Sequence, residues 1–246
     1  MNTEPSFNSP MPAPDPALLE EAQQHLEVML TRFGGDFPPT SEFSDFARAT
    51  AIVQAPVDDP DEALMTWIEW EYALFRVLEK HMVTDQLEAG FEDVDQFLSY
   101  SLSVQNRRKS RTGHALENHL IFIFERNGLR FSNGCRTENN SRPDFLFPGE
   151  DEYHVSDFDP ARLTMLGAKT TCKDRWRQVL AEAERADDKF LITREEGISE
   201  NQTDEMRSHN LQLVIPRRLQ ATYTLNQRAW LFDLRMFIQF VRNKQI

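Results

Sequence analysis

The chain has 246 residues, a formal net charge of −13 and two cysteines, Cys135 and Cys172, too few for a disulfide framework. Its first twenty residues contain neither a basic nor an apolar segment, and its longest purely apolar run, 120–124, is far too short to span a bilayer. We therefore expect a cytoplasmic protein with reduced thiols and no membrane partner.

The negative charge is unevenly distributed, which matters for a nucleic-acid partner. Residues 1–100 carry 20 Asp and Glu against 4 Lys and Arg, whereas residues 101–246 carry 20 against 23. In the second part, basic residues recur at 107–111 and again at 169–177. Because DNA phosphates are neutralised by such cations, the acidic average does not exclude DNA binding by residues 101–246.

The first hundred residues are expected to form a tail followed by helices. Residues 1–16 contain five prolines among small polar residues, which predicts a disordered tail. Asp15 followed by proline is typical of a helix start, and an apolar-periodic stretch then runs to Gly34. Another helix is predicted over about 59–83, which opens with Asp-Pro-Asp-Glu. We therefore expect a mainly helical N-terminal region at 17–100.

From about residue 101 to residue 246 the pattern changes to that of an α/β domain. A helix is expected over 115–126, where apolar residues recur at helical spacing before Asn-Gly. Short apolar stretches predict strands at 129–131, 144–147, 163–169, 189–193 and 211–215. Helical patterns cover about 174–186, 200–209 and 227–241. This alternation predicts a central mixed β-sheet flanked by helices.

Two residues at predicted strand ends have the chemistry of a nuclease. Asp144 stands at the start of one strand, and Lys169 ends another strand twenty-five positions later. If they converge at one edge of the sheet, the carboxylate can hold Mg²⁺, and the lysine can activate water and offset charge on a pentavalent phosphate. Alone the pair is a weak signal, because a turn aspartate and a surface lysine give the same pattern.

The sequence around this pair resembles the catalytic domain of the EcoRII-like type II restriction endonucleases, a branch of the PD-(D/E)XK nucleases. The resemblance rests on Pro143-Asp144, on Ala-Lys-Thr-Thr-Cys-Lys-Asp-Arg-Trp at 168–176 and on Glu182, and it extends over roughly 42–246. It implies a restriction-endonuclease-like core that hydrolyses double-stranded DNA with Mg²⁺ and no nucleotide cofactor. Cutting both strands of a palindrome with one site per chain implies a homodimer.

The sequence departs from the general nuclease pattern at the second carboxylate. Where a (D/E)XK tripeptide begins with Asp or Glu, this chain has Gly167. The resemblance implies that Glu182, on the following predicted helix, is a metal ligand together with Asp144. It also implies that Glu117 joins the metal network and that Tyr153 lies near the site as a catalytic residue. The alternatives are a solvated helix face for Glu182 and a core position for Tyr153.

A charged triplet follows the lysine at a predicted helix start. Lys173 and Arg175 can donate to guanine N7 and O6, and Asp174 can accept from cytosine N4 amino groups. In the resembled family this stretch reads a CC/GG half-site in the major groove, so a CCNGG-like site is expected. The alternative is a helix N-terminal aspartate beside two solvated cations.

The expected function is therefore a type II restriction endonuclease that cuts at a short palindrome. Two alternatives remain open. A structure-specific repair nuclease would use the same chemistry but would read the shape of DNA. A catalytically silent DNA-binding protein could be built on the same fold.

Overall fold

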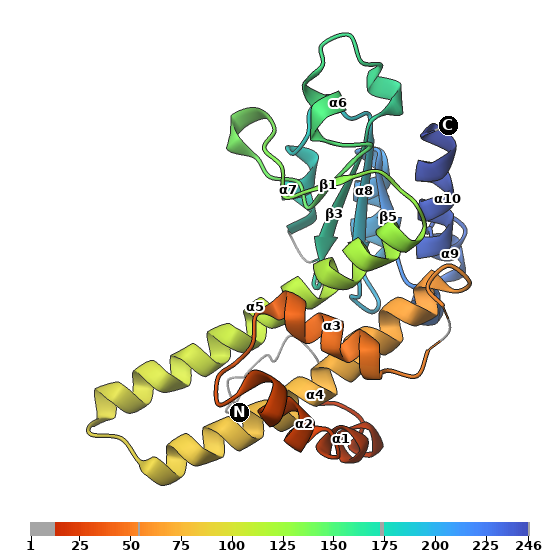
Figure 1. Ribbon diagram of the computed structural model, residues 1–246. Coiled ribbons are helices and arrows are strands. Elements are labelled where there is room, and N and C mark those ends of the chain that lie inside the picture. The colour runs from red at the N-terminus through yellow and green to blue at the C-terminus, as the bar shows by residue number, and fades with distance from the viewer. Residues whose placement is uncertain (1–12, 54, 173–174, 246) are drawn as a thin grey trace, which may run out of the picture. The chain divides into compact units, whose positions relative to one another are not determined.

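The computed structural model describes residues 13–53, 55–172 and 175–245, and the chain divides into two compact units (Figure 1). The first unit joins the residues up to Ile52 with Thr66–Asn118, and the second joins Val53–Met65 with His119–Ile246. The boundary expected near residue 100 falls inside one helix, α5 (Val94–Arg126). Within the described ranges, no helix is long and apolar enough to cross a membrane.

The first unit consists of helices. It contains α1 (Pro16–Gln23), α2 (Leu26–Phe33), α3 (Thr40–Thr50) and most of two long helices, α4 (Pro60–Ala89) and α5. Asp15 caps α1 by accepting a hydrogen bond from the backbone N of Ala17 at 2.8 Å. The helical stretch expected to run to Gly34 is divided into α1 and α2. The chain turns at Gln24 and His25, and the His25 ring packs edge-on against Trp70.

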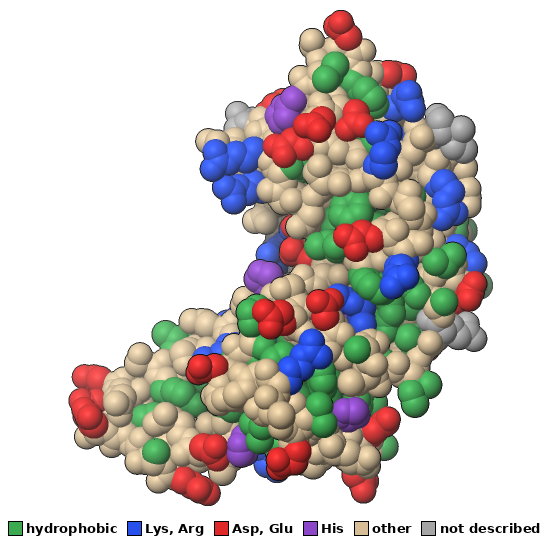
Figure 2. All heavy atoms as spheres, viewed as in Figure 1, with side chains coloured by type: hydrophobic (Ala, Val, Ile, Leu, Met, Phe, Trp, Pro, Cys, Tyr) green, Lys and Arg blue, Asp and Glu red, His purple; other side chains and the backbone are tan. Residues whose placement is uncertain are grey.

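Acidic side chains gather where α4 and α5 meet. Figure 2 shows them at the end of this helical hairpin, and the exposed residues there include Asp85, Glu88, Glu92, Asp93 and Asp95. This cluster supplies part of the negative charge of the first hundred residues. Because it would repel phosphates, we do not expect this end of the hairpin to contact DNA.

The second unit contains a five-stranded mixed sheet in the order β1-β2-β3-β4-β5. The first three strands pair antiparallel, and β3, β4 and β5 pair parallel. The strands are β1 (Ser132–Asn133), β2 (Phe145–Phe147), β3 (Thr164–Lys169), β4 (Asp188–Thr193) and β5 (Leu211–Val214). Its helices, after the end of α5, are α6 (Glu150–His154), α7 (Trp176–Leu180), α8 (Glu200–Ser208), α9 (Leu225–Arg228) and α10 (Leu234–Lys244). Short 3-10 turns are η1 (Glu138–Asn140), η2 (Pro160–Arg162) and η4 (Arg217–Thr222).

Both faces of this sheet are buried, which explains the continuous apolar runs of its strands. On one face Phe124 of α5 packs against Phe145 and Phe147, and Phe237 of α10 packs against Phe124 and Phe147, with ring centroids 5.2–5.9 Å apart. On the other face a second core includes Val179 of α7 and Met206 of α8, packed with strand residues such as Met165, Leu191 and Leu213. The expected mixed sheet flanked by helices is confirmed.

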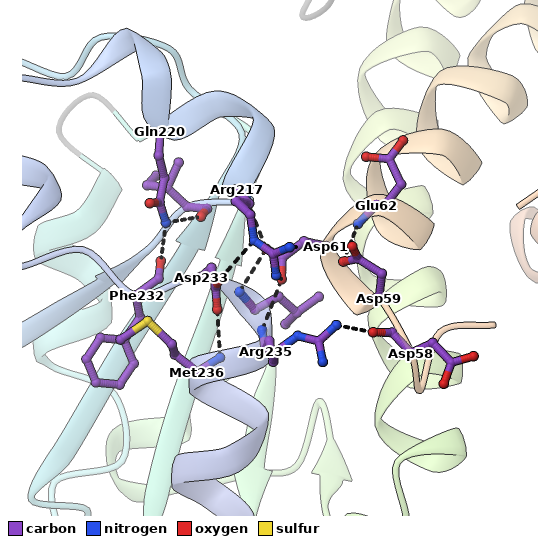
Figure 3. Close-up of polar contacts among 12 residues, drawn as sticks. Asp58, Asp59, Asp61, Glu62, Arg217, Gln220, Phe232, Asp233, Arg235 and Met236 are labelled. Carbon is purple, nitrogen blue, oxygen red and sulfur yellow. Dashed lines mark hydrogen bonds and ion pairs between the residues drawn. The ribbon is translucent and has the colours of Figure 1, made fainter. Parts of the chain in front are cut away.

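The first turn of α4 is tied to this unit by a buried carboxylate. Asp61, 2% exposed, accepts hydrogen bonds from the backbone N of Arg217, Leu234 and Arg235 at 3.1, 2.9 and 3.1 Å (Figure 3). It thereby satisfies donors at the N-terminal ends of η4 and α10, where helices leave backbone N–H groups unpaired. Burial raises the pKa of this carboxyl above its ordinary value, although the three donors oppose the shift.

Three further expected elements differ from the structure. The strand expected at 129–131 is a loop, and its Phe131 joins the aromatic cluster, while the paired residues are Ser132 and Asn133. Of the helix expected over 174–186, residue 174 lies outside the described residues, and among 175–186 the regular α-helix is α7. The terminal helix expected over 227–241 is interrupted between α9 and α10, because Phe232 forms a backbone bridge with Val214 at the sheet edge.

Candidate active site

The centre of the candidate site is a contact between the start of β2 and the end of β3. Asp144 directly precedes β2, and its Oδ2 accepts hydrogen bonds from the backbone N of Ala168 and from Lys169 Nζ, both at 2.6 Å. The antiparallel register, which pairs Phe145 with Leu166, brings these two strand ends together. The sheet therefore places the aspartate and the lysine that the sequence singled out in direct contact.

This ion pair lies largely out of solvent. The side chains of Lys169 and Asp144 are 13% and 14% exposed. A charge-assisted hydrogen bond in such surroundings is stronger than one on the surface, so each side chain restricts the orientation of the other. Both donors bind Oδ2 of Asp144. These two contacts therefore leave its other oxygen, Oδ1, for another ligand.

The second carboxylate lies in the turn after α7, because this helix ends at Leu180 and not near 186 as expected. Burial raises the pKa of Glu182 to about 7; Lys169 lowers it, Asp144 raises it and Lys189 lowers it. The influence of Asp144 and Lys169 indicates that the three groups share one electrostatic environment. Glu182 Oε2 is buried and has no hydrogen-bond partner among the described residues.

These observations fit a divalent cation. A buried oxygen that lacks a donor, beside another carboxylate, is stabilised by a bound cation, which also favours the charged form of the acid. Across the described parts of the chain, no three His, Cys, Asp or Glu side chains gather into a ready metal cluster. An ion held by Asp144 and Glu182 would therefore keep water or phosphate oxygens as further ligands, as Mg²⁺ commonly does.

Position 167 has no room for the carboxylate of the general nuclease pattern. A Cβ placed on Gly167 would lie 2.8 Å from Val179 Cγ2 and 3.6 Å from Leu191 Cδ1. Valine is stiff at χ1, so α7 would have to move to accept any side chain. Because position 167 has no side chain, α7 packs close to β3 there, and Glu182 lies in the turn directly after this helix.

Tyr153 is a buried residue of α6 and lies in the second-unit core. Its hydroxyl donates to the carboxylate of Glu138 and accepts from the backbone N of Arg185 at 3.3 Å. Burial, followed by the hydrogen bond to Glu138, raises the pKa of this phenol. Through the backbone of Arg185, the Tyr153 hydroxyl is thus bound to the segment that carries Glu182, and this contact can help to position that segment.

The sequence also singled out Glu117 and the triplet 173–175 as site residues. Glu117 is half-buried on α5, in the part of this helix that groups with the first unit. Lys173 and Asp174 lie outside the described residues. Arg175 is exposed at the N-terminal end of α7, and its backbone N donates to the Cys172 carbonyl at 2.8 Å.

Two residues around Glu182 were missed by sequence reasoning. Lys189 donates from Nζ to the carbonyls of Leu180 and Glu182, at 2.6 and 2.8 Å. Glu138 accepts from the backbone N of Glu184 at 3.3 Å. A lysine at the start of the apolar strand β4 was a detectable signal, because half-buried lysines need partners, whereas nothing around Glu138 marked it.

Comparison with known proteins gives the family. A family model described as the EcoRII C terminal matches residues 75–238. The type II restriction enzyme EcoRII of Escherichia coli is 43% identical over 203 residues, which are 82% of this chain and 50% of that protein. The chain thus spans about half the length of this relative.

Solved structures share the fold. Metal-depleted Ecl18kI in complex with uncleaved, modified DNA has a TM-score of 0.71 at 17% identity, covering 92% of this chain and 84% of that one. The complex of restriction endonuclease PspGI with substrate DNA has a TM-score of 0.61 at 14% identity, covering 94% and 93%. The fold is that of these restriction endonucleases, and the chain belongs to the EcoRII C-terminal family.

Proposed function

We propose that this chain is a Mg²⁺-dependent type II restriction endonuclease that cuts double-stranded DNA at a short palindromic site. The observation that carries the proposal is the 2.6 Å contact of Asp144 with Lys169, together with a buried Glu182 oxygen that lacks a described hydrogen-bond partner on a carboxyl group that feels both charges. The relatives support it: EcoRII is named a type II restriction enzyme, and the Ecl18kI and PspGI structures are DNA complexes.

In this proposal each residue has a distinct role. Asp144 and Glu182 hold the metal ion, which when bound supplies positive charge beside the scissile phosphate. Lys169, held in place by Asp144, directs its ammonium toward the attacking water and the charge that develops on phosphorus. Water oxygen bonds to phosphorus while the P–O3′ bond breaks, which leaves a 5′-phosphate and a 3′-hydroxyl. Glu117 is proposed to assist the metal network from α5, and Tyr153 to act near the site.

The proposed DNA-bound form is a homodimer, because one site per chain must cut both strands of a palindrome. Digestion of a sequenced plasmid, with the ends mapped, tests the function. Discrete fragments with a common CC/GG-containing end sequence are expected. Nicks confined to junctions or mismatches would support a structure-specific nuclease, and DNA binding without cleavage under any divalent metal would support a silent binding protein.

We propose that Lys173, Asp174 and Arg175 read the bases of a CCNGG-like site. Replacing Asp174 by alanine should reduce discrimination between cognate and scrambled duplexes by about 1–3 kcal/mol for each protomer. Non-specific affinity should stay constant or rise, because a negative charge near phosphates is lost. Both affinities are measured at one fixed salt concentration. An unchanged ratio between them would remove the triplet from base reading.

Acid should weaken metal binding through Glu182. Since its pKa is raised to about 7 in the metal-free chain, protons compete with the metal below that pH. The apparent Mg²⁺ affinity should therefore fall by up to about tenfold for each pH unit below about 7. Titrating Mg²⁺ into the metal-free chain by calorimetry at several pH values measures this. Glu182→Gln should bind metal weakly and show a much flatter dependence; an equally steep dependence would assign the effect to another group.

A further inference from the structure

The turn that carries Glu182 has a backbone conformation that must be held by its surroundings. α7 ends at Leu180, and Ala183, which is 1% exposed, has a φ of +48°. Non-glycine residues rarely adopt this left-handed region and do so at a cost, so they remain there when neighbouring contacts enforce it. The contacts around this turn therefore determine where the Glu182 side chain points.

Lys189 contacts the backbone of this turn with its side chain. It lies at the start of β4, where its backbone is fixed by pairing with Met165 of β3 and Leu211 of β5. Its Nζ donates to the carbonyl of Leu180 at 2.6 Å and to that of Glu182 at 2.8 Å. One ammonium group thus joins the last residue of α7 to the residue proposed as a metal ligand.

A second anchor holds the other side of the turn. The backbone N of Glu184 donates to Glu138 at 3.3 Å, and the backbone N of Arg185 donates to the Tyr153 hydroxyl at 3.3 Å. The Arg185 guanidinium donates to the carbonyls of Val155 and Phe158 at 2.9 and 3.2 Å. Residues 184–185 are therefore fixed to α6 and η1, while the carbonyls of Leu180 and Glu182 are held by Lys189.

We propose that Lys189 is a positioning residue that fixes the Glu182 carboxylate for metal binding by holding the carbonyls of Leu180 and Glu182. This inference rests on the proposed function, because it assigns Glu182 to the metal. It extends that function to a residue of β4 that need not touch the metal or DNA. Lys189 also contributes positive charge beside Glu182, which favours the ionised carboxylate.

The test measures Mn²⁺ binding to the metal-free chain of 246 residues by electron paramagnetic resonance, without turnover. Lys189→Met should weaken binding about tenfold, the scale at which residues that orient metal ligands act. Lys189→Arg, which can still donate to both carbonyls, should recover most of that loss. In a Glu182→Ala background, Lys189→Met should cause no further loss, since the residue acts through Glu182.

Lys244→Met is the matched control. Lys244 Nζ also bonds a backbone carbonyl of this unit, that of Leu163 at 3.4 Å, and pairs with Asp188, yet it contacts no part of the Glu182 turn. It should leave Mn²⁺ affinity unchanged. If Lys189→Met does not fold, Lys189→Gln, whose shorter amide can keep at most part of the two hydrogen bonds, tests the same contact, with a smaller loss of affinity that also disappears in Glu182→Ala.

Unchanged Mn²⁺ affinity in folded Lys189→Met overturns this role while leaving the proposed function intact. The role is also overturned if Lys189→Met lowers Mn²⁺ affinity equally in the unsubstituted chain and in Glu182→Ala, because Lys189 would then act on another part of the protein. If Lys189→Met does not fold, unchanged affinity in Lys189→Gln, or a loss that persists in Glu182→Ala, has the same meaning. Absence of Mn²⁺ binding by the unsubstituted chain would instead contradict the assigned metal site and the inference with it.

Discussion

Replacing Asp144 or Lys169 by alanine is expected to lower the rate of DNA cleavage by at least about 1,000-fold, because each change removes a charge that acts at the reacting phosphate. The two side chains form a 2.6 Å ion pair, so either substitution also leaves the other charge without this partner. Neither residue is proposed to contact bases. Affinity for the cognate duplex in the presence of Ca²⁺ should therefore change far less than the rate.

Single-turnover cleavage and gel-shift affinity, measured on the same preparations, separate the two effects. Glu152→Ala is a suitable control, because it removes a 2.7 Å ion pair with Arg130 that lies outside the candidate site and is more exposed. It should cleave at a near-normal rate. If either Asp144→Ala or Lys169→Ala cleaved within a few-fold of the unsubstituted chain, that residue would have no part in the mechanism.

The sequence was most informative where local pattern and tertiary structure agree. β3, β4 and β5 are each within one residue of the expected strands, because their apolar runs are buried on both faces. The convergence of Asp144 and Lys169 was also predictable, since a carboxylate at the start of one strand can meet a lysine at the end of its antiparallel neighbour. Their catalytic roles stay a prediction.

The parts that could not be predicted depend on contacts between distant residues. Nothing local indicates that α7 ends at Leu180, since the positive φ of Ala183 is enforced from outside the turn. Phe131 has the pattern of a strand residue but packs with Phe124 and Phe145 from a loop. The hydroxyl contacts of Tyr153 likewise depend on Glu138, fifteen positions away, whose partner no pattern identifies.

Restoring the general nuclease tripeptide by Gly167→Asp is expected to damage the protein and not to replace Glu182. The new Cβ would lie 2.8 Å from Val179 Cγ2, and the carboxylate would enter the apolar space between Val179 and Leu191. Overpacking together with an unpaired buried charge should cost on the order of 3–5 kcal/mol of folding stability. If α7 shifts to make room, the turn that carries Glu182 moves with it, so cleavage should also be lost.

Gly167→Ala and Val179→Ala separate the steric part of this effect from the charge. Gly167→Ala alone should lower the unfolding free energy by about 1–3 kcal/mol, and the double variant should be more stable than the sum of the two single effects, because shortening Val179 makes the space that the new methyl group needs. Chemical denaturation measures the cycle. Gly167→Asp should fail to restore cleavage to Glu182→Ala, even with Val179→Ala present, since its Cβ would still lie 3.6 Å from Leu191 Cδ1 in an apolar core. Cleavage by the Gly167→Asp, Glu182→Ala variant at a rate near that of the unsubstituted chain would show that position 167 can hold the metal after all, and that the approach of α7 does not determine which carboxylate does so.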